Sequence, residues 1–275
     1  FYKIVKSLNP ELDVFHMPST GAAHSPLYGV NYYNVTKFQD VNAIDGTCCA
    51  INHEWLYNDL SRKRNLTSEW GGLYSETPVT YVNSKLWEEL SGGALGFEHH
   101  VWSFGNDSVS FVDGLDMPRI YGQLMRMTLR DARKIDHLIL DGERAAPEIG
   151  ILFSQTARVH DQGWGWNGEK TFSAHLQSVA NYYELFLEYH RSARVVAEEM
   201  LLEGTMPAVS VLFVPQAKFL SEEVQKKLLD YAQKGGLVIC EGRIGAFDNF
   251  GRPSDSIFRE LGLVPSFAES RELRI

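Results

Sequence analysis

Short apolar runs alternate with longer amphipathic segments over the first half of the chain. We expect strands over residues 12–16, 47–52, 65–68 and 94–103, and helices over 56–63, 78–91 and 117–138, with the end of a further helix over 1–8. The run 47–52 is apolar throughout, as strands buried on both faces of a parallel sheet usually are. This alternation predicts a parallel sheet whose strands are connected by helical crossovers.

A second set of elements follows a linker near residues 145–147. We expect strands over 148–153, 209–214 and 237–240, and a long helical region over 172–203 in which Ser192 marks a candidate break. Ser221 is an expected N-cap for a helix that runs to residue 234. These elements predict a small doubly wound α/β domain over 147–275, separate from a first unit over 1–142.

Composition excludes several classes of protein. The 275 residues include 26 basic and 35 acidic side chains, for a formal net charge of −9, whereas nucleic-acid partners normally require a basic face. We find no apolar run of the ~18 residues that a membrane span requires, and no signal-peptide pattern at the start of the sequence. Three cysteines do not form a disulfide framework. We therefore expect a cytoplasmic rather than a secreted protein, with neither nucleic acid nor membrane as a partner.

Polar and aromatic residues stand where the expected strands of the first unit end. They are His16, Asn52, Glu54, Glu69, Trp70 and Trp102. In a (β/α)8 barrel the active site lies where the strands end, and four strand–helix units are half of such a barrel. Glycosidases use a pair of carboxyl groups, and tryptophan provides a large rigid face against which a sugar ring can stack. The pattern therefore favours carbohydrate chemistry.

Several longer runs resemble one enzyme family. TSEWGG and GALGFEHHVWSFGND, followed by PEIGILFS, are similar to the later part of a family 42 glycoside hydrolase, a family of β-galactosidase-like enzymes. The run VSVLFVPQAKFLSEEVQKKLLDYAQKGGLVICEG resembles that family's trimerisation domain. The resemblance implies an α/β fold: strands five to eight of a (β/α)8 catalytic barrel, then a flavodoxin-like or class I glutamine-amidotransferase-like domain, itself incomplete.

The same resemblance implies roles for individual residues. It places the nucleophile of the family, a Glu at the end of the seventh strand, at Glu69, and a Trp that lines the sugar site at Trp102. The acid/base Glu of the family follows the fourth strand, so we expect it outside this chain, in the missing N-terminal half of the barrel. The implied substrate-binding residues are His16, Asn52, Glu54, Trp70 and Trp102. The run 100–103 departs from the aromatic-Gln-Trp-Arg type run of the family, so the resemblance implies a β-galactoside or a related β-glycoside rather than one sugar.

The implied activity is retaining hydrolysis by double displacement, which requires no metal and no organic cofactor. A metal at Glu98, His99 and His100 is disfavoured because adjacent residues of a strand face opposite sides. A homo-oligomer, trimer or dimer, is also implied. Two alternatives remain open: a non-catalytic carbohydrate-binding or assembly protein derived from such an enzyme, and an amidotransferase-like activity at Cys240.

Overall fold

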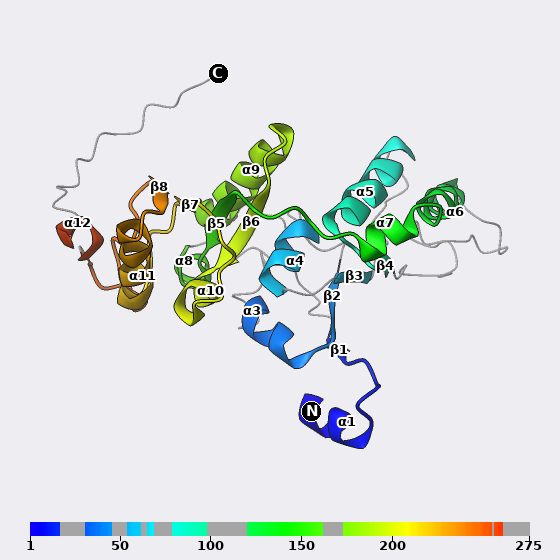
Figure 1. The fold of residues 1–275 in the computed structure, drawn as a ribbon, viewed down its shortest axis with the longest axis horizontal. Coiled ribbons are helices and arrows are strands. Elements are labelled where there is room, and N and C mark those ends of the chain that lie inside the picture. The colour runs from blue at the N-terminus through cyan, green and yellow to red at the C-terminus, as the bar shows by residue number, and fades with distance from the viewer. Residues whose placement is uncertain are drawn as a thin grey trace.

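The computed structural model describes residues 1–16, 31–45, 54–61, 65–68, 79–97, 120–161, 173–254 and 256–260. Two four-stranded sheets form the framework of these residues, and an extended segment over residues 142–148 connects the two (Figure 1). All pairings between neighbouring strands in both sheets are parallel. The predicted parallel α/β organisation is confirmed.

The first sheet follows the order of the chain. Its strands are β1 (Phe15–His16), β2 (Val41–Asp45), β3 (Asn65–Ser68) and β4 (Gly96–Phe97), arranged β1-β2-β3-β4. Between β2 and β3 lies α4 (Glu54–Ser61), and between β3 and β4 lies α5 (Val79–Gly92), against which α6 (Ile120–Ala132) packs. The shorter helices are α1 (Tyr2–Leu8), α3 (Tyr32–Val35), η1 (Thr36–Phe38) and α7 (Asp136–Asp141).

Two sequence predictions for this unit need correction. The strand between β1 and β3 is Val41–Asp45, which was not predicted, and the predicted strand 47–52 lies outside the described residues. The single helix predicted over 117–138 is two helices, because the backbone leaves the helical region at Ile135 (φ −123°, ψ 17°) and α7 begins at Asp136. An acidic residue favours a new helix N-terminus at this point. Strand β3 has the bounds that the sequence predicted.

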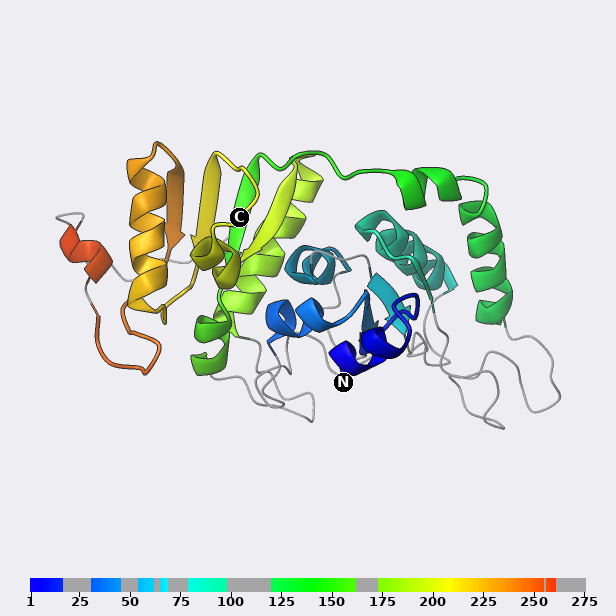
Figure 2. The ribbon, with the colours of Figure 1, turned by 60° about the horizontal axis from the view of Figure 1, so that its bottom comes forward.

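The second sheet has the order β6-β5-β7-β8. Its strands are β5 (Ile149–Phe153), β6 (Ala193–Ala197), β7 (Val211–Pro215) and β8 (Leu237–Glu241). Helix α9 (Ala174–Glu188) lies against β5, β6 and β7, and α11 (Glu222–Gln233) contacts β8 and α10 (Glu198–Glu203) (Figure 2). The remaining helices are α8 (Gln155–His160) and α12 (Ser256–Glu260). The chain therefore extends the sheet to both sides of its first strand, as in doubly wound folds.

The long helix predicted over 172–203 was wrong. Strand β6 interrupts it at Ala193, one residue after the candidate break at Ser192, and α10 begins directly after the strand. Residues that form helices readily flank β6, but Val195 and Val196 are fully buried beside β5, where β-branched side chains pack well. The predicted cap is confirmed, since Ser221 Oγ accepts a hydrogen bond from the Val224 N–H at 3.2 Å.

One apolar core joins the two sheets. Tyr32, Tyr33, Leu56 and Leu60, from α3 and α4, belong to the same cluster of buried side chains as the residues of the second sheet. Helix α4 lies along β6, the edge strand of that sheet (Figure 2). A helix over an edge strand covers backbone groups that would otherwise remain unpaired. The two units are therefore packed against each other through this side of the first sheet.

Candidate functional site

The carboxyl ends of the first four strands lie at one edge of the first sheet. His16 pairs with Asn42, Asp45 pairs with Ser68, and Thr67 pairs with Phe97. Residues that follow these strands therefore start from a common edge, which is where a barrel places its active site. Glu69 is the residue that directly follows Ser68 at the end of β3.

Most of the predicted site residues lie beyond what the structure describes. Glu69, Trp70, Asn52 and Trp102 are outside the described residues, as are Glu98, His99 and His100. For His16 and Glu54 only the backbone is described. His16 is the last residue of β1, as predicted. Glu54 is the first residue of α4, and Val41–Asp45 is the last strand that the structure describes before it.

At the carboxyl edge of the second sheet a buried polar network connects three strand ends. Glu198, directly after β6, accepts hydrogen bonds from Ser154 Oγ at 2.7 Å and from Thr156 N and Oγ1 at 2.8 Å each. Ser154, directly after β5, is fully buried, and its Oγ also accepts the Ala157 N–H at 2.9 Å as the N-cap of α8. Desolvation by burial raises the pKa of Glu198, and these hydrogen bonds oppose that shift. The carboxylate is thus held in place by three hydrogen bonds from two residues of its own domain, Ser154 and Thr156.

His175 completes this network from α9. Its Nε2 accepts the Ser154 N–H at 2.8 Å, so Nδ1 carries the proton and donates to the Pro215 carbonyl at 2.6 Å. Burial lowers the pKa of His175 to about 4, which keeps the ring neutral at physiological pH. With both nitrogens occupied, the ring connects β5, α9 and β7 and has no free position for acid–base chemistry. This network could not be predicted from local sequence patterns, because its members come from segments far apart in the chain.

Cys240 lies within β8, on the edge of the second sheet. The residue is exposed, yet partial desolvation of its sulfur raises the pKa of the thiol. A reactive cysteine requires the opposite shift, because the thiolate is the nucleophile. Cys240 sits inside a regular strand paired with Val214, which favours a structural rather than a nucleophilic cysteine.

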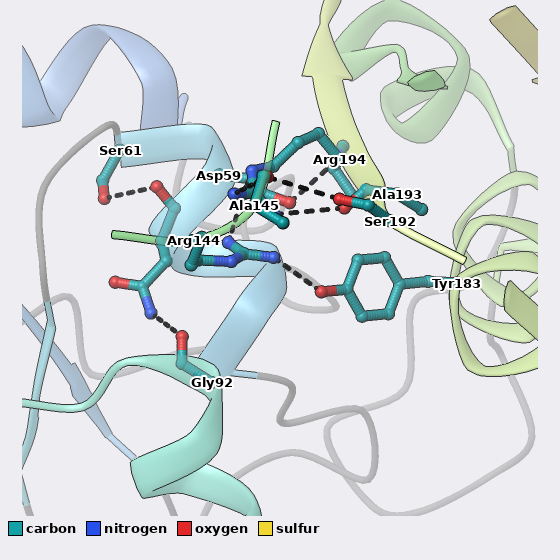
Figure 3. Close-up of polar contacts among 11 residues, drawn as sticks. Asp59, Ser61, Gly92, Arg144, Ala145, Tyr183, Ser192, Ala193 and Arg194 are labelled. Carbon is teal, nitrogen blue, oxygen red and sulfur yellow. Dashed lines mark hydrogen bonds and ion pairs between the residues drawn. The ribbon is translucent and has the colours of Figure 1, made fainter. Parts of the chain in front are cut away.

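The junction between the two units holds a cluster of charged groups around Asp59 of α4. Arg144 Nη1 lies 2.6 Å from Asp59 Oδ1, and Arg194 Nε lies 3.5 Å from the same oxygen. The other carboxylate oxygen accepts the Val195 N–H of β6 at 2.9 Å, so the carboxylate pairs a backbone group of the edge strand. Arg144 also donates to Tyr183 Oη at 2.7 Å (Figure 3).

Burial dominates the electrostatics of this junction. Desolvation raises the pKa of Asp59 to about 6, although Arg144, the Val195 N–H and Arg194 all favour the ionised carboxylate. Desolvation and the charge of Arg144 lower the pKa of Arg194. A single carboxylate therefore faces two guanidinium groups in a site largely removed from water.

Within the part of the chain that the structure describes, no group of three or more His, Cys, Asp or Glu side chains could hold a metal ion. The described helices include none that is both long and apolar enough to cross a bilayer.

Comparison with known proteins supports the fold. Residues 199–272 match the family model described as "GLMA-like, second domain". No curated protein matches the chain. Gan42B, a GH42 β-galactosidase from G. stearothermophilus, superimposes with a TM-score of 0.70 at 16% identity, over 91% of this chain and 40% of that one.

Two further similar solved structures are of enzymes with other activities. An exo-carrageenase of GH42 from Bacteroides ovatus matches with a TM-score of 0.61 at 14% identity, over 82% of this chain and 34% of that one. The exo-β-1,4-mannosidase Op5Man5 from Opitutaceae bacterium strain TAV5 matches with a TM-score of 0.54 at 14% identity, over 82% and 43%. This chain thus spans less than half the length of each enzyme. The predicted resemblance to GH42 β-galactosidases is confirmed at the level of the fold.

Proposed function

We propose that this chain supplies strands five to eight of a (β/α)8 barrel and, after them, a flavodoxin-like domain of the class I glutamine-amidotransferase type. Four parallel strands in consecutive order with intervening helices are the repeating pattern of such a barrel. The order β6-β5-β7-β8 corresponds to the first four strands of the flavodoxin-like order 2-1-3-4-5. The similarity to GH42 β-galactosidases over 91% of the chain supports both assignments.

The first sheet presents surfaces that the remaining half of a barrel would cover. Its end strands, β1 and β4, have one paired side each. Large apolar side chains around β1 are more than half exposed: Ile4, Leu8, Leu12, Phe15 and Phe38. Several exposed large apolar side chains in one region commonly mark a packing or binding face. We therefore propose an N-terminal half-barrel as the packing partner of this surface.

The proposed reaction is retaining hydrolysis of a β-glycoside. The observation that carries it is the position of Glu69 directly after β3, the third of the four consecutive strands. There the Glu69 carboxylate would attack the anomeric carbon and form a glycosyl-enzyme while the glycosidic oxygen leaves with a proton from an acid/base carboxyl group. That second group would come from the other half of the barrel, and it would next activate the water that releases the sugar.

The sugar is a β-galactoside or a related β-glycoside. The similar solved structures are of a β-galactosidase, an exo-carrageenase and a mannosidase, so the fold is compatible with several sugars. We propose that substrate contacts come from His16, Asn52, Glu54, Trp70 and Trp102. A homo-oligomer is also part of the proposal, since Leu237 and Ile239 leave apolar surface exposed on β8.

The test is Glu69→Gln in a protein that contains the whole barrel. Hydrolysis of an aryl β-galactoside should fall by more than about a thousandfold, as expected for loss of a nucleophile. Glu188→Gln, which removes an exposed carboxylate from α9, should leave the rate unchanged. Glu69→Ala should recover activity with azide and release the α-configured glycosyl azide, because azide then attacks from the face that the carboxylate vacated.

Retained activity in Glu69→Gln would overturn the nucleophile assignment. If the wild-type protein binds galactosides but hydrolyses none, the non-catalytic alternative is correct. Amidotransferase activity that disappears in Cys240→Ser would instead support the third hypothesis, against which the raised thiol pKa of Cys240 stands.

A further inference from the structure

Helix α10 of the second unit holds the short helix α3 of the first through polar contacts (Figure 1). Asn31 Nδ2 donates to Glu199 Oε1 at 2.5 Å, and Tyr33 Oη donates to Glu203 Oε2 at 2.5 Å. Lys37 Nζ, in η1 directly after α3, lies 2.7 Å from the other oxygen of Glu203. Two carboxylates of one helix therefore accept hydrogen bonds from three residues of the other unit.

Two of these donors are also fixed by the first unit itself. Asn31 is the N-cap of α3, since its Oδ1 accepts the Asn34 N–H at 3.0 Å, so one side chain both begins α3 and joins it to α10. Tyr33 is only 6% exposed and belongs to the core cluster that the two units share. The exposed ion pair of Lys37 alone would contribute little. A buried ring and a helix cap make the attachment of α3 more specific than a surface ion pair.

Helix α10 is itself anchored in the second unit. Glu198, its first residue, accepts hydrogen bonds from Ser154 and Thr156 at the carboxyl edge of the second sheet. Met200 and Leu201, one turn further, are buried in the core. The helix also follows β6 without an intervening loop. It can therefore act as a fixed base for the part of the first unit that contacts it.

Helix α3 belongs to the connection from β1 to β2, which leaves the carboxyl end of β1 after His16. At the far end of this connection, Asp40 directly precedes β2. Its N–H donates to the Val14 carbonyl at 2.6 Å, and its Oδ2 accepts the Val14 N–H at 2.8 Å. The first unit thus holds the return of the chain to the amino edge, whereas α10 holds the part that comes from the proposed catalytic edge.

We propose that Glu199 and Glu203 are positioning residues for the substrate site of the proposed glycoside hydrolase. By holding α3 they fix the connection that starts after His16, so that the substrate does not have to select one arrangement of it from several. Such selection reduces the apparent affinity by the fraction of molecules in the binding-competent arrangement. The inference rests on the proposed function, and it gives the second unit a part in substrate binding without a contact between that unit and the sugar.

The test compares Tyr33→Phe and Glu203→Ala in a protein that contains the whole barrel, with an aryl β-galactoside as substrate. Tyr33→Phe removes one hydroxyl and keeps the buried ring, so we expect the fold to be retained. Each variant should raise KM by about three- to tenfold and change kcat by less than about twofold, because the proposed nucleophile is untouched. In the double variant the two effects should not add, since both substitutions remove the same hydrogen bond.

Glu188→Ala and Tyr189→Phe are the matched controls, because they change the same types of side chain at exposed positions of the second unit, and both should leave KM and kcat unchanged. Partial unfolding lowers the amount of active enzyme and hence the apparent kcat, but it does not change KM. An active wild type whose KM is unchanged in Tyr33→Phe and Glu203→Ala would overturn the inference and leave the proposed function intact. A wild type that hydrolyses no aryl β-galactoside, β-glucoside or β-mannoside would overturn both.

Discussion

Asp59 and Arg144 form an ion pair of 2.6 Å between a helix of the first unit and the linker to the second. The same carboxylate accepts the N–H of Val195 on the edge of the second sheet. Asp59 therefore balances the charge of Arg144 in the linker and also accepts a backbone hydrogen bond from the edge strand β6. This dual role makes it the polar centre of the junction, beside the apolar contacts of Leu56 and Leu60.

Removing the Asp59 carboxylate should destabilise the whole chain. Asp59→Ala leaves the Val195 N–H without its acceptor and both arginines without a counter-charge, so we expect a loss of about 3 kcal/mol in the free energy of unfolding. Asp59→Asn keeps one acceptor oxygen and avoids burying a charge, so it should cost about 1 kcal/mol. Urea denaturation provides both values. Asp131→Asn, at an exposed carboxylate that pairs with Lys134, should change stability by less than about 0.5 kcal/mol.

Asp59 should also make the stability of the folded chain depend on pH. Its pKa is raised from 3.8 to about 6 in the folded chain, so the folded state binds more protons between these values. The stabilisation from proton uptake is complete below pH 4 and is lost as the pH rises through 6. The difference in unfolding free energy, wild type minus Asp59→Asn, should therefore fall between pH 4 and 6. A difference that rises over this interval would contradict the burial-dominated pKa.

His175 should make the free energy of unfolding depend on pH in the opposite direction from Asp59. Its pKa is lowered from 6.5 to about 4, so the unfolded chain binds more protons in this interval. The corresponding stabilisation is present above pH 6.5 and is lost as the pH falls through 4. In His175→Gln the free energy of unfolding should therefore rise less steeply between pH 4 and pH 6.5 than it does in the wild-type chain. Because Asp59 and His175 act oppositely over nearly the same interval, the two contributions partly cancel in the wild-type chain.

Local signals allowed much of the fold to be predicted. The bounds of β3 and the cap at Ser221 depend on neighbouring residues, and both were predicted correctly. Strand β6 was missed because its five residues stand between segments that favour helices, and only burial beside β5 selects the extended backbone. Tertiary packing of this kind overrides local propensity.

The junction could not be predicted from local patterns. Asp59 is 85 positions from Arg144 and 136 from Val195, and nothing near Asp59 in the sequence indicates either partner. Its helix was predicted, but a single Asp on an amphipathic helix is typical of a solvated face. The candidate catalytic residue Glu69 is the converse case. Its position directly after a strand was predicted from the sequence, whereas its surroundings would depend on other segments of the proposed barrel.

The Glu198 carboxylate should stabilise the loops that follow β5 and β6 at the carboxyl edge of the second sheet. In Glu198→Gln an amide nitrogen replaces one acceptor oxygen, so that a donor faces either the Ser154 hydroxyl or the donors of Thr156. We expect a loss of about 1–3 kcal/mol in unfolding free energy. Glu199→Gln, at the next position of α10, is the comparison, because the Glu199 carboxylate accepts a hydrogen bond from Asn31 Nδ2 of the first unit instead of from Ser154 or Thr156. Equal losses in the two variants would refute a special role for the Glu198 carboxylate.

Gly236 should tolerate no side chain while Tyr231 keeps its position. A Cβ at Gly236 would lie 2.3 Å from Tyr231 Cε1, and Tyr231 Oη donates to the Val209 carbonyl at 2.8 Å, which holds the ring beside the start of β7. Gly236→Ala should therefore cost about 1–3 kcal/mol through overpacking. Gly204→Ala is the control for backbone strain alone, since Gly204 has a φ of +69° with open space around it, and it should cost about 1 kcal/mol.

A double-mutant cycle tests the cause of this cost. Tyr231→Leu removes the ring that the new methyl group would meet, so Gly236→Ala should be less destabilising in that background than in the wild-type chain. The coupling should be about 1 kcal/mol or more, because the two side chains are in direct contact. Additive effects would mean that the alanine acts on the backbone at the start of β8 rather than through Tyr231, and chemical denaturation of the four proteins distinguishes these outcomes.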